Sequence, residues 1–140
     1  TEGRKNLLFY TDPDYGFVIN GVVRVPGRTG SVHDHADAWV LYGLLDGHET
    51  LERFERIDDR SKEDYAEVRL TSADQGQAGK ADLVAPYDIH AEQGSDIRSV
   101  AVILRSNVLV GRVLQGRYDR ETNKYFTGSG PEQIPYELSA

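Results

Sequence analysis

The sequence contains no cysteine and no methionine. Without cysteine, the chain cannot form disulfide bonds, use a thiolate nucleophile or bind zinc through sulfur. It also has no apolar run approaching the roughly 20 residues that span a bilayer, and residues 1–4 show no apolar signal segment. We therefore expect a cytoplasmic protein. Because the chain starts at Thr1 rather than at methionine, we also expect that N-terminal sequence is missing.

The chain has fewer basic than acidic residues. The chain has 16 lysines and arginines against 23 aspartates and glutamates, which gives a net charge of −7 and a pI of about 5.0. Nucleic acids and anionic membrane surfaces repel such a protein, so we expect neither as a partner. The length of 140 residues and the hydrophobic content of 39% are typical of one soluble globular domain, residues 1–140. The oligomeric state stays open, with a homodimer among the alternatives.

Helical periodicity is nearly absent, and only residues 60–67 could hold a helical turn or two. Short apolar or alternating runs are separated by glycine, proline, aspartate and asparagine, a pattern typical of an all-β domain. Eight or more short strands indicate a double sheet closed towards a barrel, although the pattern alone does not separate a barrel from a sandwich. The predicted strands are residues 17–25, 39–45, 49–57, 66–71, 80–85, 89–90, 99–105 and 108–114, with a short one at 125–126.

Two further expectations concern the end of the chain. Residues 100–104 are apolar on both strand faces, so the strand at 99–105 should be central and covered on both sides. The tail, residues 129–140, has the composition of a loop.

Three of the four histidines form a pattern that suits a metal. His33 and His35 are two residues apart, and in a strand such residues project from the same face. His90, close behind Pro86, could complete a facial triad that leaves positions open for substrate and dioxygen. The alternative is a chance pair together with a hydrogen-bonded surface histidine. We interpret His48, in the turn after Asp46-Gly47, as solvated.

The segment 30–35, which begins with a glycine and contains His33-Asp34-His35, resembles the first cupin motif when taken with the following strand and turn glycine. The stretch from Pro86 to His90 is similar to the second motif. The resemblance implies a cupin double-stranded β-helix, or jelly-roll barrel, with a metal on His33, His35 and His90. The usual motif also carries a glutamate ligand a few residues after the histidine pair, where this chain has Trp39 and Val40.

Because it lacks that glutamate, the chain resembles the three-histidine branch of the cupins. This is the cysteine dioxygenase-like branch, whose members are thiol dioxygenases. The resemblance implies iron(II) as the cofactor. It also implies that Arg4, upstream of the apolar residues 7–10, is a substrate-binding arginine, and residues 116–122 are similar to the family's terminal turn. Nickel, zinc, copper and manganese are the alternative metals, because imidazole suits several of them.

The chain departs from that branch at two places. Val40 stands where mammalian members have a crosslinked cysteine, and Ala101, Ile103 and Arg105 replace a serine-histidine-tyrosine relay. Thiol oxidation is therefore the weaker expectation. Arg105 falls on the same strand face as Ala101 and Ile103, which predicts that it points into the barrel, although a surface arginine or a partner such as Asp37 or Asp88 would also explain it.

Three neutral imidazoles would leave the full 2+ charge on the metal, which favours an anionic, chelating substrate. Arg105 would then pair with the substrate's carboxylate. Trp39 and Tyr42 are expected in the core or the pocket wall, and we include them among the substrate-binding residues. We thus expect an iron(II) dioxygenase-like cupin that oxidises a small organic acid with O2. The alternatives are a thiol dioxygenase, a non-redox metal cupin such as a lyase or isomerase, and a small-ligand sensor.

Overall fold

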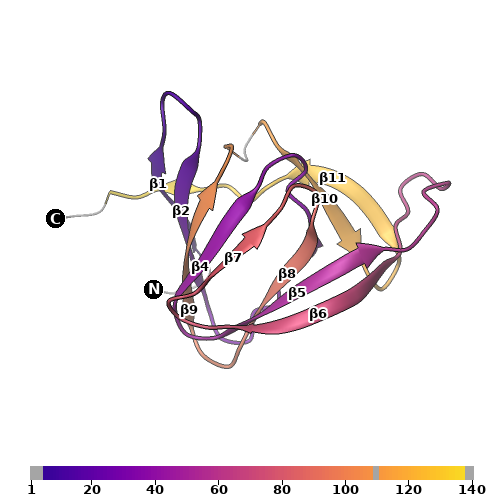
Figure 1. Cartoon of the computed structure of the whole chain (residues 1–140), viewed down its shortest axis with the longest axis horizontal. Helices are drawn as coiled ribbons and strands as arrows, with labels where there is room; N and C mark the ends of the chain where they lie inside the picture. The colour runs from indigo at the N-terminus through magenta and orange to yellow at the C-terminus, as the bar shows by residue number, and fades with distance from the viewer. Residues whose placement is uncertain (1–4, 109–110, 138–140) are drawn as a thin grey trace.

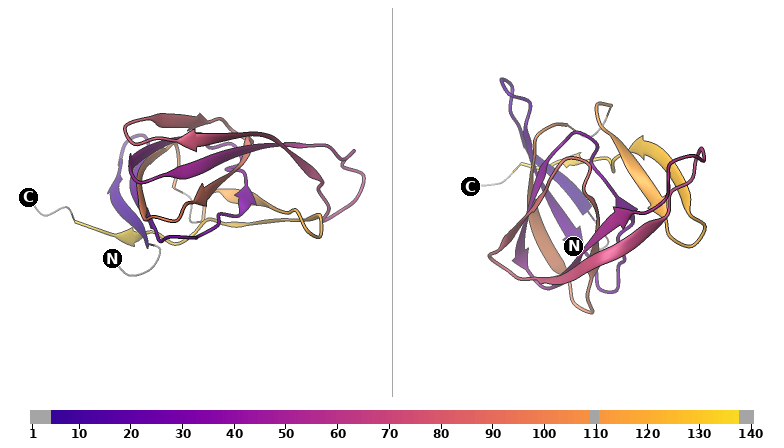
Figure 2. Two further views of the ribbon diagram at one scale, coloured as in Figure 1. Left: turned by 90° about the horizontal axis from the view of Figure 1, so that it is seen from below. Right: turned by 45° about the vertical axis from the view of Figure 1, so that its right-hand side comes forward.

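The computed structural model describes residues 5–108 and 111–137, which form two six-stranded β-sheets that face each other (Figures 1 and 2). In order across the first sheet, the strands are β12 (Ile134–Pro135), β1 (Lys5–Thr11), β2 (Val18–Arg24), β9 (Ser99–Arg105), β4 (Val40–Asp46) and β7 (Ala81–Val84). Across the second sheet they are β11 (Lys124–Ser129), β10 (Leu114–Asp119), β3 (Val32–His33), β8 (Ile89–Gly94), β5 (Glu49–Arg56) and β6 (Val68–Gly76). This all-β, two-sheet architecture confirms the predicted fold class.

Strand β9 lies at the centre of the first sheet, paired with β2 and β4. Every second residue from Ser99 to Arg105 is buried, which is the alternation expected when one face of a strand meets the core. The central position was predicted correctly. The expected cover on both sides is only partial, because the outward residues of β9 are half-buried: Val100, Val102 and Leu104.

The apolar core has two main parts. One cluster lies between the sheets and consists of Val22, Val40, Tyr42, Leu44, Val84, Ala101 and Ile103, with Leu51 packed against it. The other consists of Val32, Phe54, Ile89 and Ala91, with Val68 and Tyr118 against it. In β3 and β8 these apolar residues alternate with His33 and His90. The second cluster therefore packs on the face opposite to the one that carries the histidines.

Most predicted strands are present within a few residues, and Ser99–Arg105 has the predicted bounds. Of the strand predicted at 108–114, residues 109–110 lie outside the described residues, and the prediction is wrong for the others except Leu114. Gly111, with φ of +77°, lies in a turn, and strand β10 begins only at Leu114. The predicted loop 129–140 contains the short strand β12, and β1 was not among the predicted strands. Residues 60–67 form turns without a helix, because Arg60 and Asp64 have positive φ and interrupt any right-handed helical run.

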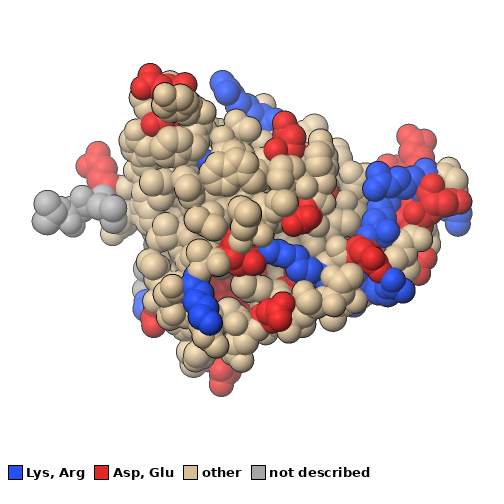
Figure 3. All heavy atoms as spheres, viewed as in Figure 1, with Lys and Arg blue, Asp and Glu red and all other residues tan. Residues whose placement is uncertain are grey.

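Acidic and basic side chains are intermingled on the face of the molecule shown in Figure 3, most densely near the connection between β5 and β6. Within the part of the chain that the structure describes, no helix is long and apolar enough to cross a membrane.

Candidate metal centre

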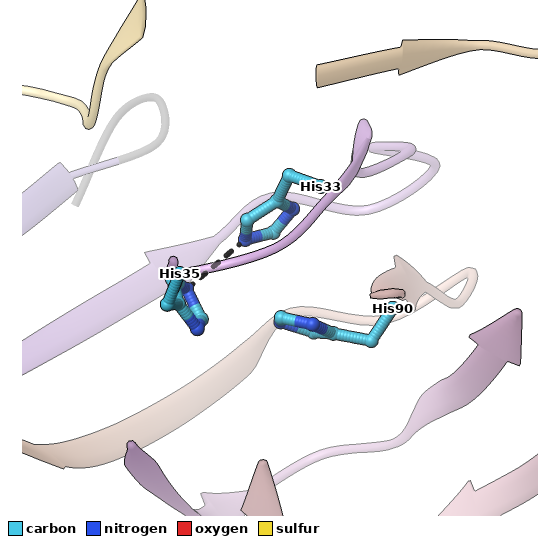
Figure 4. A group of neighbouring side chains, drawn as sticks. All are labelled: His33, His35 and His90. Carbon is cyan, nitrogen blue, oxygen red and sulfur yellow. Dashed lines mark hydrogen bonds between the residues drawn. The ribbon is translucent and has the colours of Figure 1, made fainter. Parts of the chain in front are cut away.

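The three predicted ligands converge in the interior (Figure 4). The metal-binding atoms of His33, His35 and His90 all lie within 4.8 Å of one another, and the Nε2 atoms of His33 and His35 are 3.2 Å apart. His33 on β3 is the direct cross-strand partner of His90 on β8. The topology therefore brings together ligands that are far apart in the sequence.

Backbone carbonyl groups orient two of the three rings. The Nδ1 atom of His33 lies 2.9 Å from the carbonyl oxygen of Ser31, and that of His90 lies 3.0 Å from the carbonyl oxygen of Asp88. A carbonyl only accepts hydrogen bonds, so Nδ1 carries the proton in both rings and Nε2 turns its lone pair towards the cluster. This is the tautomer that a metal-binding histidine needs, and the donor set fits a divalent ion of the iron, nickel or zinc kind.

The surroundings also keep two of these rings neutral. Burial lowers the pKa of His33 from 6.5 to about 4, with a smaller contribution from His90. The pKa of His35 is lowered further, first by burial and then by His33 and Arg105. A neutral imidazole is the metal-binding form, so burial prepares both side chains for a metal.

The loop between the two motif histidines is held by Asp34. Its Oδ1 atom accepts hydrogen bonds from the backbone N–H groups of Ala36 (2.8 Å) and Gly116 (3.1 Å), and its Oδ2 atom accepts one from the hydroxyl of Tyr118 (2.7 Å). The sequence pattern predicted one strand for both histidines. In fact β3 ends at His33, and this anchored turn brings His35 back to the cluster.

A cavity of about 170 Å³ adjoins the histidines. Among its lining residues are two of the histidines, three arginines and one carboxylate: His33, His35, Arg24, Arg105, Arg117 and Glu92. Its apolar wall includes Val40 and Ile103. A wider outer groove of about 900 Å³ shares Gly30, Ser31, Arg117 and Ser129 with this cavity, so the two spaces adjoin each other.

Arg105 is buried in this cavity, only 7% exposed. It donates a hydrogen bond from Nε to the Oδ1 atom of Asn20 at 3.1 Å, and its Nη1 atom lies 3.2 Å from Nε2 of His35. Among the described residues it forms no ion pair; Asp37 is exposed, and Asp88 accepts a backbone bond from Ala85. The inward position was predicted correctly, and a surface arginine is excluded.

Arg24 offers a contrast within the same cavity. It is also buried, but its Nε atom lies 3.7 Å from the carboxylate of Glu49, and Nη1 donates to the backbone carbonyl of Glu92. Glu49 in turn accepts hydrogen bonds from the hydroxyls of Tyr42 and Ser99. The charge of Arg24 is therefore balanced within the protein, whereas Arg105 has only neutral hydrogen-bond partners.

The remaining predicted residues have different outcomes. Tyr42 is buried, lines the cavity and donates its hydroxyl to Glu49, as expected for a wall residue. The prediction that Trp39 belongs to the core or the cavity wall is wrong. Val40 and Tyr42 face inward, so strand alternation turns Trp39 outward, where it is 40% exposed. His48 is exposed, as expected. Arg4 lies outside the described residues, and its role stays a prediction.

Sequence reasoning missed three charged residues of the cavity: Arg24, described above, Glu92 and Arg117. The Oε1 atom of Glu92 lies 3.3 Å from Nε2 of His90, and Arg117 donates hydrogen bonds to Ser31 and Gln115 at the boundary with the groove. Strand alternation could have found Glu92, because it is two residues after His90 and must share its face. Arg117 carried no such signal, because its strand was predicted at the wrong place.

By sequence, the chain matches no described protein family and no curated protein. Several solved structures share its fold. A Klebsiella pneumoniae protein with a double-stranded β-helix domain superposes with a TM-score of 0.58 at 13% identity, over 82% of this chain and 79% of that one. An oxalate oxidase in complex with the substrate analogue glycolate gives 0.56 at 15% identity, over 75% and 51%. The DMSP lyase DddQ from Ruegeria pomeroyi gives 0.55 at 14% identity, over 81% and 51%.

These similarities show that the chain has a double-stranded β-helix fold. The chain spans about half the length of the oxalate oxidase and of the lyase. The matched enzymes include an oxidase and a lyase, so the fold is compatible with both chemistries. The narrower likeness to the cysteine dioxygenase-like branch rests on the sequence motifs alone.

Proposed function

We propose that the chain is a metal-dependent cupin oxidoreductase that oxidises a small organic acid with O2, with iron(II) on His33, His35 and His90. One observation carries the proposal: two of the three convergent histidines, His33 and His35, line a cavity with Arg105, a buried cation that forms no ion pair among the described residues. A buried charge without a counter-ion is costly, so an anion is the ligand that this cavity favours.

The chain's own residues would bind and orient the substrate. Arg105 can bind a carboxylate with its planar guanidinium. Arg117, at the boundary with the outer groove, offers a second cation on the path inward. Val40, Ile103 and Tyr42 exclude water from the reacting atoms. Bound iron(II) would supply the redox chemistry and the positions for substrate and dioxygen.

The size of the cavity favours a small substrate. About 170 Å³ is less than the 300–1,000 Å³ typical of pockets for drug-sized ligands. The structurally similar oxalate oxidase binds glycolate, which is a small acid of the class that Arg105 would hold. A thiol is less favoured, because Ala101 and Ile103 on the inner face of β9 offer no groups for a proton relay.

The test combines metal analysis with an oxygen electrode. Iron(II)-loaded protein should consume O2 in step with the loss of one member of a panel of small hydroxy acids, dicarboxylates, diketones and thiols. His33→Ala, His35→Ala and His90→Ala should each abolish stoichiometric metal binding and O2 uptake, while His48→Ala should change neither. Turnover without O2 would contradict the oxidase activity and indicate a lyase or isomerase. Tight binding without turnover would indicate a sensor. Full metal retention by His90→Ala would refute the centre itself.

A further inference from the structure

A carboxylate lies in the histidine cavity although the positions that usually supply it hold Trp39 and Val40. Glu92 is on β8, two residues after His90, and its Oε1 atom lies 3.3 Å from Nε2 of His90. Glu92 also lines the cavity together with His33 and His35. From this arrangement we propose that Glu92 is a fourth protein ligand of the metal centre. The inference rests on the metal centre of the proposed function, but not on its redox chemistry or its substrate.

The distances suit ligands of one ion. Nitrogen and oxygen ligands lie about 2.0–2.2 Å from a metal such as zinc, so neighbouring ligand atoms around one ion are roughly 3.0–3.5 Å apart. The pair of His90 and Glu92, at 3.3 Å, falls in that range, as does the pair of His33 and His35, at 3.2 Å. Relative to His90, the glutamate oxygen therefore has the spacing of a neighbouring ligand atom.

The chemistry of the two facing atoms favours a cation between them. The proton of His90 is on Nδ1, which donates to the carbonyl of Asp88, so Nε2 presents a lone pair. That lone pair faces a carboxylate oxygen of Glu92, and Nε2 has no hydrogen-bond partner among the described residues. Two acceptors this close repel each other unless a proton or a metal ion lies between them, and a metal ion would satisfy both atoms together with His33 and His35.

The backbone of Glu92 is fixed from two sides. Arg24 donates a hydrogen bond to its carbonyl oxygen. Gly30 packs so closely that a Cβ atom there would lie 2.4 Å from the same oxygen. Among the described residues, neither Arg24 nor Arg105 forms an ion pair with the Glu92 side chain. The main chain at Glu92 is thus held in place, and its carboxylate is left free of arginine ion pairs, as a preorganised ligand needs to be.

A ligated Glu92 changes what the centre can bind. The net charge of the ion and its ligands falls from 2+ to 1+, and an octahedral ion keeps two open positions instead of three. The metal alone then attracts an anion less strongly than a three-histidine site would. Selection for an acid would depend correspondingly more on Arg105.

The experiment uses cobalt(II) as the probe, titrated calorimetrically and by visible absorption into the full chain after chelator treatment. Glu92→Gln should lower the cobalt affinity at least about tenfold, since even an outer-shell partner of a ligand contributes about 10–100-fold. The absorption bands of cobalt should also shift, because a water or an amide replaces the carboxylate. The matched control is Glu52→Gln on the neighbouring strand β5, which removes the same charge from a half-buried glutamate whose partner is Gln93. It should leave affinity and spectrum unchanged.

The outcomes separate this inference from the function proposed above. Cobalt binding to Glu92→Gln with wild-type affinity and spectrum would overturn the role of Glu92 while leaving the three-histidine centre intact. Wild-type protein that binds no cobalt would overturn both. If Glu92→Gln does not fold, Glu92→Asp replaces it. That variant keeps the charge but shortens the side chain, so an unchanged cobalt spectrum would equally refute direct ligation.

Discussion

Arg105 shows how much of this site depends on single residues. Its position on β9 turns it inward, beside His35 and Asn20, and burial lowers its pKa from 12.5 to about 10. That pKa still leaves the guanidinium charged at neutral pH. A permanent, buried cation next to the candidate metal centre would favour anions among the molecules that enter the cavity.

We therefore predict that Arg105→Gln weakens binding of the acid identified by the oxygen screen by about 2–5 kcal/mol, the usual cost of truncating a buried charge pair. Arg105→Lys should also lose much of the affinity, because a point charge cannot replace a two-pronged contact. Calorimetric titration measures both, and metal content should stay at the wild-type level. Arg98→Gln, an exposed arginine paired with Asp46, is the control. Robust turnover of cysteine or mercaptopropionate that Arg105→Gln leaves unchanged would contradict this prediction and indicate a thiol dioxygenase.

The histidines also predict a pH dependence for the metal-free protein. The folded state lowers the pKa of His33 from 6.5 to about 4, so between these values the unfolded chain binds more protons than the folded one. The free energy of unfolding should therefore decrease as pH falls from about 6.5 to 4, by up to about 1.4 kcal/mol per pH unit for this residue. His35 acts in the same direction and extends the loss to lower pH.

Urea unfolding at several pH values between 7 and 4 measures this slope. His33→Gln and His35→Gln should each flatten it, while His48→Gln, at an exposed site, should not. The same slope in the wild type and in all three variants would show that His33 and His35 are not kept neutral by burial.

At the level of secondary-structure elements, the contact between β10 and the loop after β3 positions the centre. Gly116 of β10 donates its N–H to Asp34, and Tyr118 of the same strand donates its hydroxyl. A strand that contributes no metal ligand thus sets the path of the loop between His33 and His35. The residue type at position 116 matters, because the carboxylate of Asp34 occupies the space where a Cβ atom would be.

Gly116→Ala should consequently disturb both stability and metal binding. The new Cβ atom would lie 2.3 Å from Oδ2 of Asp34, so the anchor must move. We expect a loss of about 1–3 kcal/mol in the free energy of unfolding, as for other overpacked sites, together with a weaker cobalt affinity. Gly128→Ala on the paired strand β11 is the matched control, because nothing lies within 4 Å of its added Cβ atom. Equal effects of the two substitutions would contradict the anchoring role of Asp34.

For the whole molecule, the apolar clusters form a core that needs no metal. The cluster around Val40 and Ile103 joins strands of the first sheet, and the cluster around Phe54 and Ile89 covers the outer face of the second. The three histidines belong to neither cluster, and strand pairing and packing already hold the two sheets together.

Removing the metal should thus lower the melting temperature without unfolding the domain. A ligand bound only to the folded state stabilises it by RT ln(1 + [L]/Kd), about 2.7 kcal/mol when its free concentration is a hundred times Kd. Circular dichroism in the presence of a chelator should keep the β signal at room temperature, with a lower thermal midpoint. Disappearance of that signal on chelation would mean that the metal is part of the core.

Much of this structure was predictable because it depends on local periodicity. Alternation within one strand determined the all-β class, the bounds of Ser99–Arg105 and the inward direction of Arg105. The histidine pattern and the cupin resemblance predicted the cluster of His33, His35 and His90. Trp39 was placed wrongly although the same rule, applied from Val40, turns it outward. The strand after residue 108 was placed too early, because apolar content did not reveal the turn at Gly111.

The sequence by itself determined which residues alternate on which strand face, and with them the fold class and the three imidazoles. Only the tertiary structure decided what stands beside those imidazoles. Glu92 meets His90 within one strand, but its role depends on the cavity that the opposite sheet closes. Arg105 and Asp34 likewise acquire their partners, Asn20 and Gly116, across long stretches of sequence. The physical reason is that strand periodicity is local, whereas register and sheet order arise from packing between distant segments.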